Sequence, residues 1–169
     1  ILAEGIGHLI HTIRSNYNIT FIIHNNSNFA LTTGQASPAT PLHTKMNGSP
    51  DGVQASPINI SQLVLNLQPS FYARGFSGKQ KQLASLITEA NKHKGFSIVE
   101  VLQSCPSYNY FMSNDWYLKR IFDVNENTKY DSSNLGSAIS ITKDLEDKIA
   151  TGLIYKNEWN ETFMKSQKS

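Results

Sequence analysis

The sequence predicts an α/β fold with a mainly parallel sheet that is covered by helices on both sides. Apolar, β-branched runs at 19–24 and 96–102 are typical of buried strands. An amphipathic helix is predicted at 79–94, and Gly95 is placed where a C′ glycine would end it. Strands that alternate with helices are typical of βαβ units, whose strands run parallel.

The remaining elements of this body follow from shorter patterns. Residues 3–16 and 58–67 are predicted to be helical because their apolar side chains recur at helical spacing. A short strand is predicted at 71–75. The stretch 25–57 is rich in Ser, Thr, Pro, Gly and Asn, and loops of this length are usually functional or disordered.

The character of the chain changes after the cysteine at position 105. Residues 106–169 are polar and aromatic, and we predict helical pieces near 114–124 and 142–150 but no strong strand. We therefore expect two parts, an α/β domain at 1–105 and a small irregular carboxyl-terminal extension at 106–169 that packs on it.

Composition excludes several classes of function. A net charge of +2 is too small to indicate nucleic-acid binding, and no apolar run is long enough to cross a bilayer. A single cysteine fits a reducing compartment, so we expect a cytoplasmic protein. The chain begins with Ile1 rather than Met, and we interpret it as a fragment of a longer polypeptide.

The two amides Asn25 and Asn26 are the most informative residues. They follow the apolar run 19–24 directly and open into a polar loop, as expected where a parallel strand delivers ligands at its carboxyl end. Amide and backbone oxygens suit Mg²⁺ that also holds a phosphorylated ligand. The alternative is a loop whose asparagines only cap turns.

Short phrases along nearly the whole chain carry a family resemblance. They lie at 7–11, 25–26, 31–38, 73–76, 93–97, 101–106 and 150–155. In this order they resemble the β subunit of the 2-oxoacid:ferredoxin oxidoreductases, the thiamine-diphosphate enzymes that include pyruvate:ferredoxin oxidoreductase. The phrases at 31–38 and 101–105 are specific when they occur together.

The resemblance implies a thiamine-diphosphate-binding fold and an activity for the intact enzyme. Such an enzyme oxidatively decarboxylates a 2-oxoacid with coenzyme A and passes electrons to ferredoxin. Pyruvate, 2-oxoglutarate and branched or aromatic acids all stay open as substrates. The resemblance also implies a separate α subunit with the pyrimidine-binding domain and the proton-relay glutamate, so no catalytic residue is assigned to this chain.

The same resemblance assigns roles to residues of the polar loop. It implies that the Asn26 side chain and the Asn28 backbone carbonyl are ligands of Mg²⁺. Leu31 and Thr32 would pass beside the diphosphate, and His8 would line the cofactor site.

Cys105 is implied to be one ligand of a 4Fe-4S iron–sulfur cluster in the intact protein. The other three ligands would come from upstream cysteines that this chain lacks; the alternative is a small buried hydrophobic residue. Gly-Asp-Gly, which supplies the first Mg²⁺ ligand in such enzymes, would lie upstream of Ile1. For Arg74 we favour a structural salt bridge over a phosphate contact.

Two alternatives to this function remain. One is another thiamine-diphosphate decarboxylase or synthase, which would need no cluster and would be distinguished by iron analysis. The other is a non-catalytic assembly subunit or fragment, since the Gly-Asp-Gly motif is missing from the chain.

Overall fold

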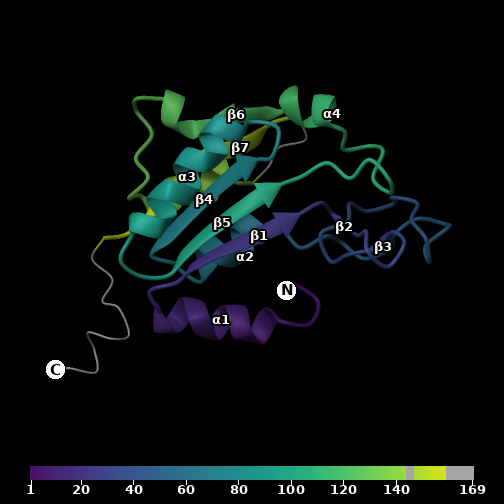
Figure 1. Ribbon diagram of the computed structural model, residues 1–169, viewed down its shortest axis with the longest axis horizontal. Helices are drawn as coiled ribbons and strands as arrows, with labels where there is room; N and C mark the ends of the chain where they lie inside the picture. Colours follow the sequence, from purple (N-terminus) through teal and green to yellow (C-terminus); the bar gives the residue numbers. More distant parts are fainter. Residues whose placement is uncertain (144–146, 159–169) are drawn as a thin grey trace.

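A five-stranded sheet organises the computed structural model, which describes residues 1–143 and 147–158 (Figure 1). The strand order is β1-β5-β4-β7-β6; β1, β5 and β4 run parallel, and β7 is antiparallel to β4. The carboxyl ends of β1, β5 and β4 therefore meet at one edge, and the prediction of a mainly parallel α/β fold is confirmed. The strands are β1 (Thr20–Asn25), β4 (Phe71–Phe76), β5 (Ser97–Leu102), β6 (Ile121–Asp123) and β7 (Ile149–Lys156).

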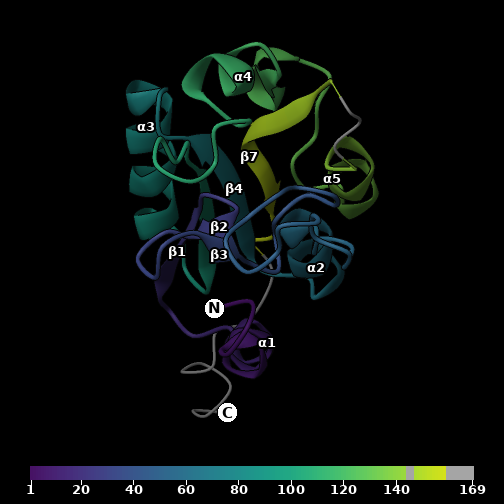
Figure 2. The ribbon, with the colours of Figure 1, turned by 90° about the vertical axis from the view of Figure 1, so that its right-hand side faces the viewer.

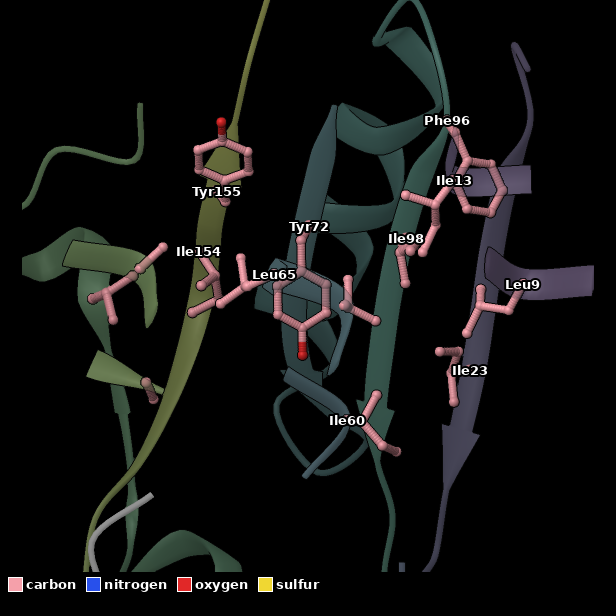
Figure 3. Packing of buried hydrophobic residues seen from close by; sticks show 14 residues of the cluster. Leu9, Ile13, Ile23, Ile60, Leu65, Tyr72, Phe96, Ile98, Ile154 and Tyr155 are labelled. Atoms are coloured by element: carbon pink, nitrogen blue, oxygen red, sulfur yellow. The ribbon is translucent and has the colours of Figure 1, made fainter. Parts of the chain in front are cut away.

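Helices cover both faces of the sheet, as Figure 2 shows. Helix α3 (Gln80–Lys92) lies on one face, where Leu86 and Ala90 pack against apolar side chains of β4 and β5. The other face carries the larger core, in which Tyr72 and Ile98 of the sheet meet helical residues (Figure 3). Those residues come from α1 (Ile6–Ser15), α2 (Ile60–Asn66) and α5 (Leu135–Ile141).

Gly95 does not end α3 in the way predicted. The helix ends at Lys92, and its cap residue His93 is extended, so Gly95 lies beyond the C′ position. It has a φ of +129°, and a Cβ there would come within 2.6 Å of both Asn16 Oδ1 and Ser70 Oγ. The glycine is required because α1, β4 and the start of β5 converge on it.

Strand β1 is parallel, as predicted, but less buried than its apolar sequence suggests. Only Ile23 is buried, and Ile22 is 37% exposed. In the described part of the chain β1 pairs with β5 alone, so its other edge has no neighbouring strand. Strands β4 and β5, which lie inside the sheet, are buried at all six positions each.

The prediction that residues 106–169 contain no strong strand is wrong. Both β6 and β7 belong to the central sheet, and β7 contributes the buried core residue Ile154. The helix predicted at 114–124 is confirmed only in its first part, α4 (Asn114–Leu118). At 142–150 the described residues hold Thr142, which caps α5 after its last residue Ile141, and the start of β7, while 144–146 lie outside the described residues.

The long loop after β1 lies beyond the carboxyl ends of the parallel strands (Figure 1). It contains a two-stranded ribbon formed by β2 (Asn28–Phe29) and β3 (Gln35–Ala36), then irregular chain up to α2. The loop thus lies over the edge at which the ligands were predicted. Among residues 1–143 and 147–158, no helix combines the length and the apolar character that a membrane span requires.

Candidate metal and cofactor site

A tight turn at the end of β1 shapes the predicted magnesium ligands. The backbone of Ser27 adopts the left-handed conformation with φ +56°, and its N–H donates to Asn25 Oδ1 at 3.2 Å. Asn26 Oδ1 accepts the Asn28 N–H at 3.3 Å, and Asn28 Nδ2 donates back to the Asn26 carbonyl at 3.0 Å. Thr40 Oγ1 fastens the turn by donating to the Ser27 carbonyl at 2.6 Å. Each asparagine therefore caps the turn, as the alternative interpretation requires, and the same hydrogen bonds hold Asn26 and Asn28 in fixed positions.

A buried carboxylate connects this turn to the sheet. Asn25 Nδ2 donates to Glu100 Oε1 at 2.8 Å, and Glu100 lies in the middle of the buried strand β5. The other carboxylate oxygen accepts Arg74 Nε at 3.1 Å and the Tyr72 hydroxyl at 2.6 Å. Arg74 also donates to the Ser61 hydroxyl and to the Ala150 carbonyl.

This network confirms the prediction of a salt bridge for Arg74. Arg74 and Glu100 are 2% and 1% exposed, so neither charge is offered to solvent. Burial, and then the negative charge of Glu100, raise the pKa of Tyr72 well above its usual value, which keeps its hydroxyl a proton donor. The ion pair is joined to the turn at 25–28 by the hydrogen bond from the Asn25 amide to Glu100.

Glu100 was not singled out in the sequence, although a signal for it was present. It is the only charged residue in the apolar run 96–102. A charge inside a strand that is predicted to be buried needs a partner, because burying an unpaired charge is costly. Arg74 holds the equivalent position in the predicted strand at 71–75, and the register pairs it directly with Glu100.

A cavity of about 600 Å³ opens at the carboxyl edge beside this network. Its polar lining includes Asn25, Arg74 and Glu100. Tyr117, which is 1% exposed, also lines it, and in the described part of the chain its hydroxyl has no hydrogen-bond partner. Its apolar lining includes Pro41 and Ile58 of the long loop, Leu102 at the end of β5, and Met112 in the segment after Cys105.

Cys105 lies three residues beyond β5 at the same edge and is buried. Burial alone would raise the pKa of its thiol, but hydrogen bonds from the Asn28 side chain and from three backbone N–H groups outweigh it and lower the pKa. Those groups belong to Ser107, Tyr108 and Asn109. The structure therefore brings together two residues predicted from separate phrases, Asn28 and Cys105, in surroundings that favour a thiolate.

The other predicted cofactor residues lie at the surface. Leu31 is 99% exposed, and Thr32 is exposed with its hydroxyl donating to Gln35 Oε1 at 2.5 Å. His8 lies on the exposed side of α1. Their assignment to a cofactor remains a prediction.

The chemistry of the turn and of the thiol fits the groups predicted for them. Asn26 and Asn28 carry the hard oxygen donors that Mg²⁺ prefers, and the buried Oδ1 of Asn28 has no partner among the described residues. A thiol with a lowered pKa, surrounded by N–H donors, suits ligation of an iron–sulfur cluster. The part of the chain that the structure describes holds no group of three or more His, Cys, Asp or Glu arranged for a metal.

Comparison with protein-family models divides the chain near this cysteine. Residues 1–101 match "Thiamine pyrophosphate enzyme, C-terminal TPP binding domain". Residues 105–169 match the family model of the C-terminal part of the pyruvate ferredoxin oxidoreductase β chain.

Individual relatives agree with these matches. The 2-oxoacid:ferredoxin oxidoreductase subunit beta of Saccharolobus solfataricus is 33% identical over 95% of this chain and 51% of its own. The 2-oxoglutarate synthase subunit KorB of Methanothermobacter marburgensis is 38% identical over 63% of this chain and 37% of its own. The chain thus spans about half, or less, of the length of these relatives.

A solved structure shows a similar fold. It is the 2-oxoglutarate:ferredoxin oxidoreductase from Magnetococcus marinus with 2-oxoglutarate, coenzyme A and succinyl-CoA bound. The match has a TM-score of 0.93 and 30% sequence identity, and it covers 99% of this chain and 56% of the other.

Proposed function

Because this chain belongs to the β-subunit family of the 2-oxoacid:ferredoxin oxidoreductases, we propose that it forms the diphosphate-binding part of such an enzyme. The complete enzyme would oxidatively decarboxylate a 2-oxoacid in the presence of coenzyme A and deliver the electrons to ferredoxin. It would work in the cytoplasm with an α subunit that carries the pyrimidine-binding domain. We assign cofactor binding to residues 1–105 and the β-subunit extension to 106–169, with both parts sharing the central sheet.

The observation that carries the proposal is the hydrogen-bonded turn at the end of β1. In our proposal Asn26 Oδ1 and the Asn28 carbonyl bind Mg²⁺, and the ion holds the diphosphate of the cofactor. Thiamine diphosphate, when bound, supplies the carbon nucleophile and the electron sink of the reaction. This chain would position the cofactor. The Asn25 amide joins the turn to Glu100, and the Thr40 hydroxyl donates to the Ser27 carbonyl within the turn.

The second part of the proposal concerns Cys105. We assign it as one ligand of an iron–sulfur cluster, with the remaining ligands supplied from outside the described residues. The lowered pKa of its thiol supports this assignment, as does the hydrogen bond that the thiol accepts from the Asn28 side chain at the carboxyl edge of the sheet. The cluster would then lie within reach of electrons that leave the cofactor.

The magnesium site is tested in the complete β subunit assembled with its α partner. Asn26→Ala removes one proposed ligand, and we expect the affinity for thiamine diphosphate with Mg²⁺, measured by titration calorimetry, to fall about ten-fold or more. Asn91→Ala is the matched control, since Asn91 is exposed on α3. Unchanged affinity in the Asn26 variant would overturn the assignment.

The cluster is tested by iron and sulfide analysis of the same assembled protein. Cys105→Ser is expected to lose or damage one cluster while the secondary structure is retained. Full iron content in this variant would contradict the ligand role. Absence of iron and sulfide from the unaltered protein would instead favour a thiamine-diphosphate enzyme without a cluster. Turnover on a panel of 2-oxoacids, with pyruvate and 2-oxoglutarate included, would then identify the substrate.

A further inference from the structure

One buried asparagine joins the two segments of the proposed site. Asn109 is 3% exposed and lies in the turn that follows Cys105. Its backbone N–H donates to the Cys105 carbonyl at 3.1 Å, and its side-chain Nδ2 donates to the Asn26 carbonyl at 3.2 Å. Its Oδ1 accepts the Met112 N–H at 3.3 Å. The side-chain Nδ2 therefore ties the turn at 105–109 (the cysteine turn) to the turn at 25–28 (the magnesium turn). The backbone N–H and Oδ1 hold Asn109 in place within its own segment.

Two further contacts connect the same segments. The Asn28 side chain donates to the Asn26 carbonyl and also hydrogen-bonds the Cys105 thiol. At Gly34, where φ is +86°, the Tyr108 ring lies so close that no Cβ would fit. The loop after β1 and the segment after β5, about 80 residues apart in sequence, thus form one hydrogen-bonded unit.

We propose that Asn109 is a positioning residue that couples the magnesium–diphosphate site to the iron–sulfur cluster. Its side-chain amide fixes the Asn26 peptide and with it the direction of the Asn26 side chain. Its backbone keeps the N–H groups of the cysteine turn directed at the thiolate. Groups in such supporting positions set both the affinity of a metal site and, through hydrogen bonds to sulfur, the reduction potential of a cluster.

The inference rests on the proposed function and makes an additional prediction that does not follow from the proposed function alone. A single change at Asn109 must alter two properties, although Asn109 is a ligand of neither group. The affinity for thiamine diphosphate with Mg²⁺ must fall, and the reduction potential of the cluster must move.

Asn109→Asp is the sharpest variant for the test. The carboxylate is the same size and still accepts the Met112 N–H, but it cannot donate, and it places a negative charge against the Asn26 carbonyl. In the assembled enzyme we expect cofactor affinity, by calorimetry, to fall about ten-fold or more. The cluster should show an altered electron paramagnetic resonance spectrum and a lower reduction potential, since added negative charge and lost N–H···S alignment disfavour the reduced cluster.

Asn127→Asp is the matched control. Asn127 is exposed, and its Oδ1 accepts the Lys129 N–H at 3.1 Å, so the same exchange keeps the local hydrogen bond without touching the site. Asn109→Ala is the second variant, because it removes the side-chain hydrogen bonds without adding charge and serves if the aspartate variant fails to fold. We expect it to lower the cofactor affinity and to change the cluster spectrum as well.

The coupling is overturned if the folded Asn109 variants match the wild type in cofactor affinity, or if only one of the two properties changes. Failure of the proposed function gives a different pattern. In that case Asn26→Ala leaves cofactor affinity unchanged and Cys105→Ser leaves the iron content unchanged, whatever happens at position 109.

Discussion

At the scale of single residues, the site depends on a pair of charges that is buried under it. Arg74 and Glu100 stand side by side on β4 and β5, with Nε and Oε2 at 3.1 Å. The remaining donors around Glu100 come from Tyr72, Ser61 and Asn25, so both carboxylate oxygens accept hydrogen bonds. A buried ion pair of this kind costs much desolvation energy, and removal of one partner leaves the other charge unpaired in the interior.

We therefore expect Glu100→Gln to lower the free energy of unfolding by about 3 to 5 kcal/mol, measured by urea denaturation. The matched control is Glu126→Gln, because Glu126 is exposed and its loss should change stability by about 0.5 kcal/mol or less. The double variant Arg74→Met with Glu100→Leu should recover much of the loss, since no charge is then left unpaired. A loss below about 1 kcal/mol for Glu100→Gln would contradict this account.

At the scale of elements, the start of β5 is constrained by what surrounds Gly95. Asn16 at the end of α1 accepts the Phe96 N–H at 2.8 Å and the Ser70 hydroxyl at 2.8 Å. The His93 ring reaches the same hydroxyl at 3.0 Å. These contacts link α1, α3, β4 and β5 at the amino-terminal edge of the sheet, opposite the turn at 25–28.

Gly95→Ala is expected to destabilise the protein by more than about 1 kcal/mol. The positive φ disfavours a side chain, and the new Cβ would press on the Asn16 and Ser70 oxygens. Gly7→Ala is the matched control, because Gly7 is helical and a methyl group added to it would have nothing within 4 Å; it should stabilise by roughly 0.5 kcal/mol. Thermal unfolding followed by circular dichroism measures both changes, and equal effects at the two glycines would contradict the argument.

At the scale of the whole molecule, the two halves of the chain share one sheet. Strand β7 pairs with β4 on one side and with β6 on the other, so residues beyond position 105 form part of the central sheet. Ile154 is fully buried and belongs to the same core as Leu9 and Tyr72. The boundary at 105 and 106 separates the two halves in sequence, but the sheet is continuous across it.

A chain that ends at residue 105 should therefore not fold cooperatively. It would lose β7, leaving the edge of β4 that β7 covers unpaired and the core around Tyr72 open to water. We expect a broad thermal transition and aggregation, where the complete chain shows a single transition by circular dichroism. A sharp transition in the shortened chain would show that residues 1–105 form an independent domain.

Local patterns along the chain were enough to predict most of its elements. Apolar runs and helical spacing placed β1, β5 and α3 within one to two residues at each end, because each pattern reports directly on which side of an element is buried. The turn at 25–28 was also predictable locally, since two amides end the apolar run. The family resemblance connected Cys105 with this turn through the order of the phrases along the sequence, but it predicted no contact between them.

Contacts between distant segments were decided only by the tertiary structure. β6 and β7 were missed because β6 has only three residues and because the β7 sequence contains a glycine, which is unfavourable in a strand. Gly152 is needed there because its φ is +110° and because a Cβ would meet Asp123 and Asn125 Oδ1. Glu100 gained its partner only through the register of β4 with β5, and Asn109 reached Asn26 only because two loops fold over the same edge. Sequence periodicity records whether a residue faces a core, whereas the identity of its neighbour depends on how strands far apart in the chain are ordered in the sheet.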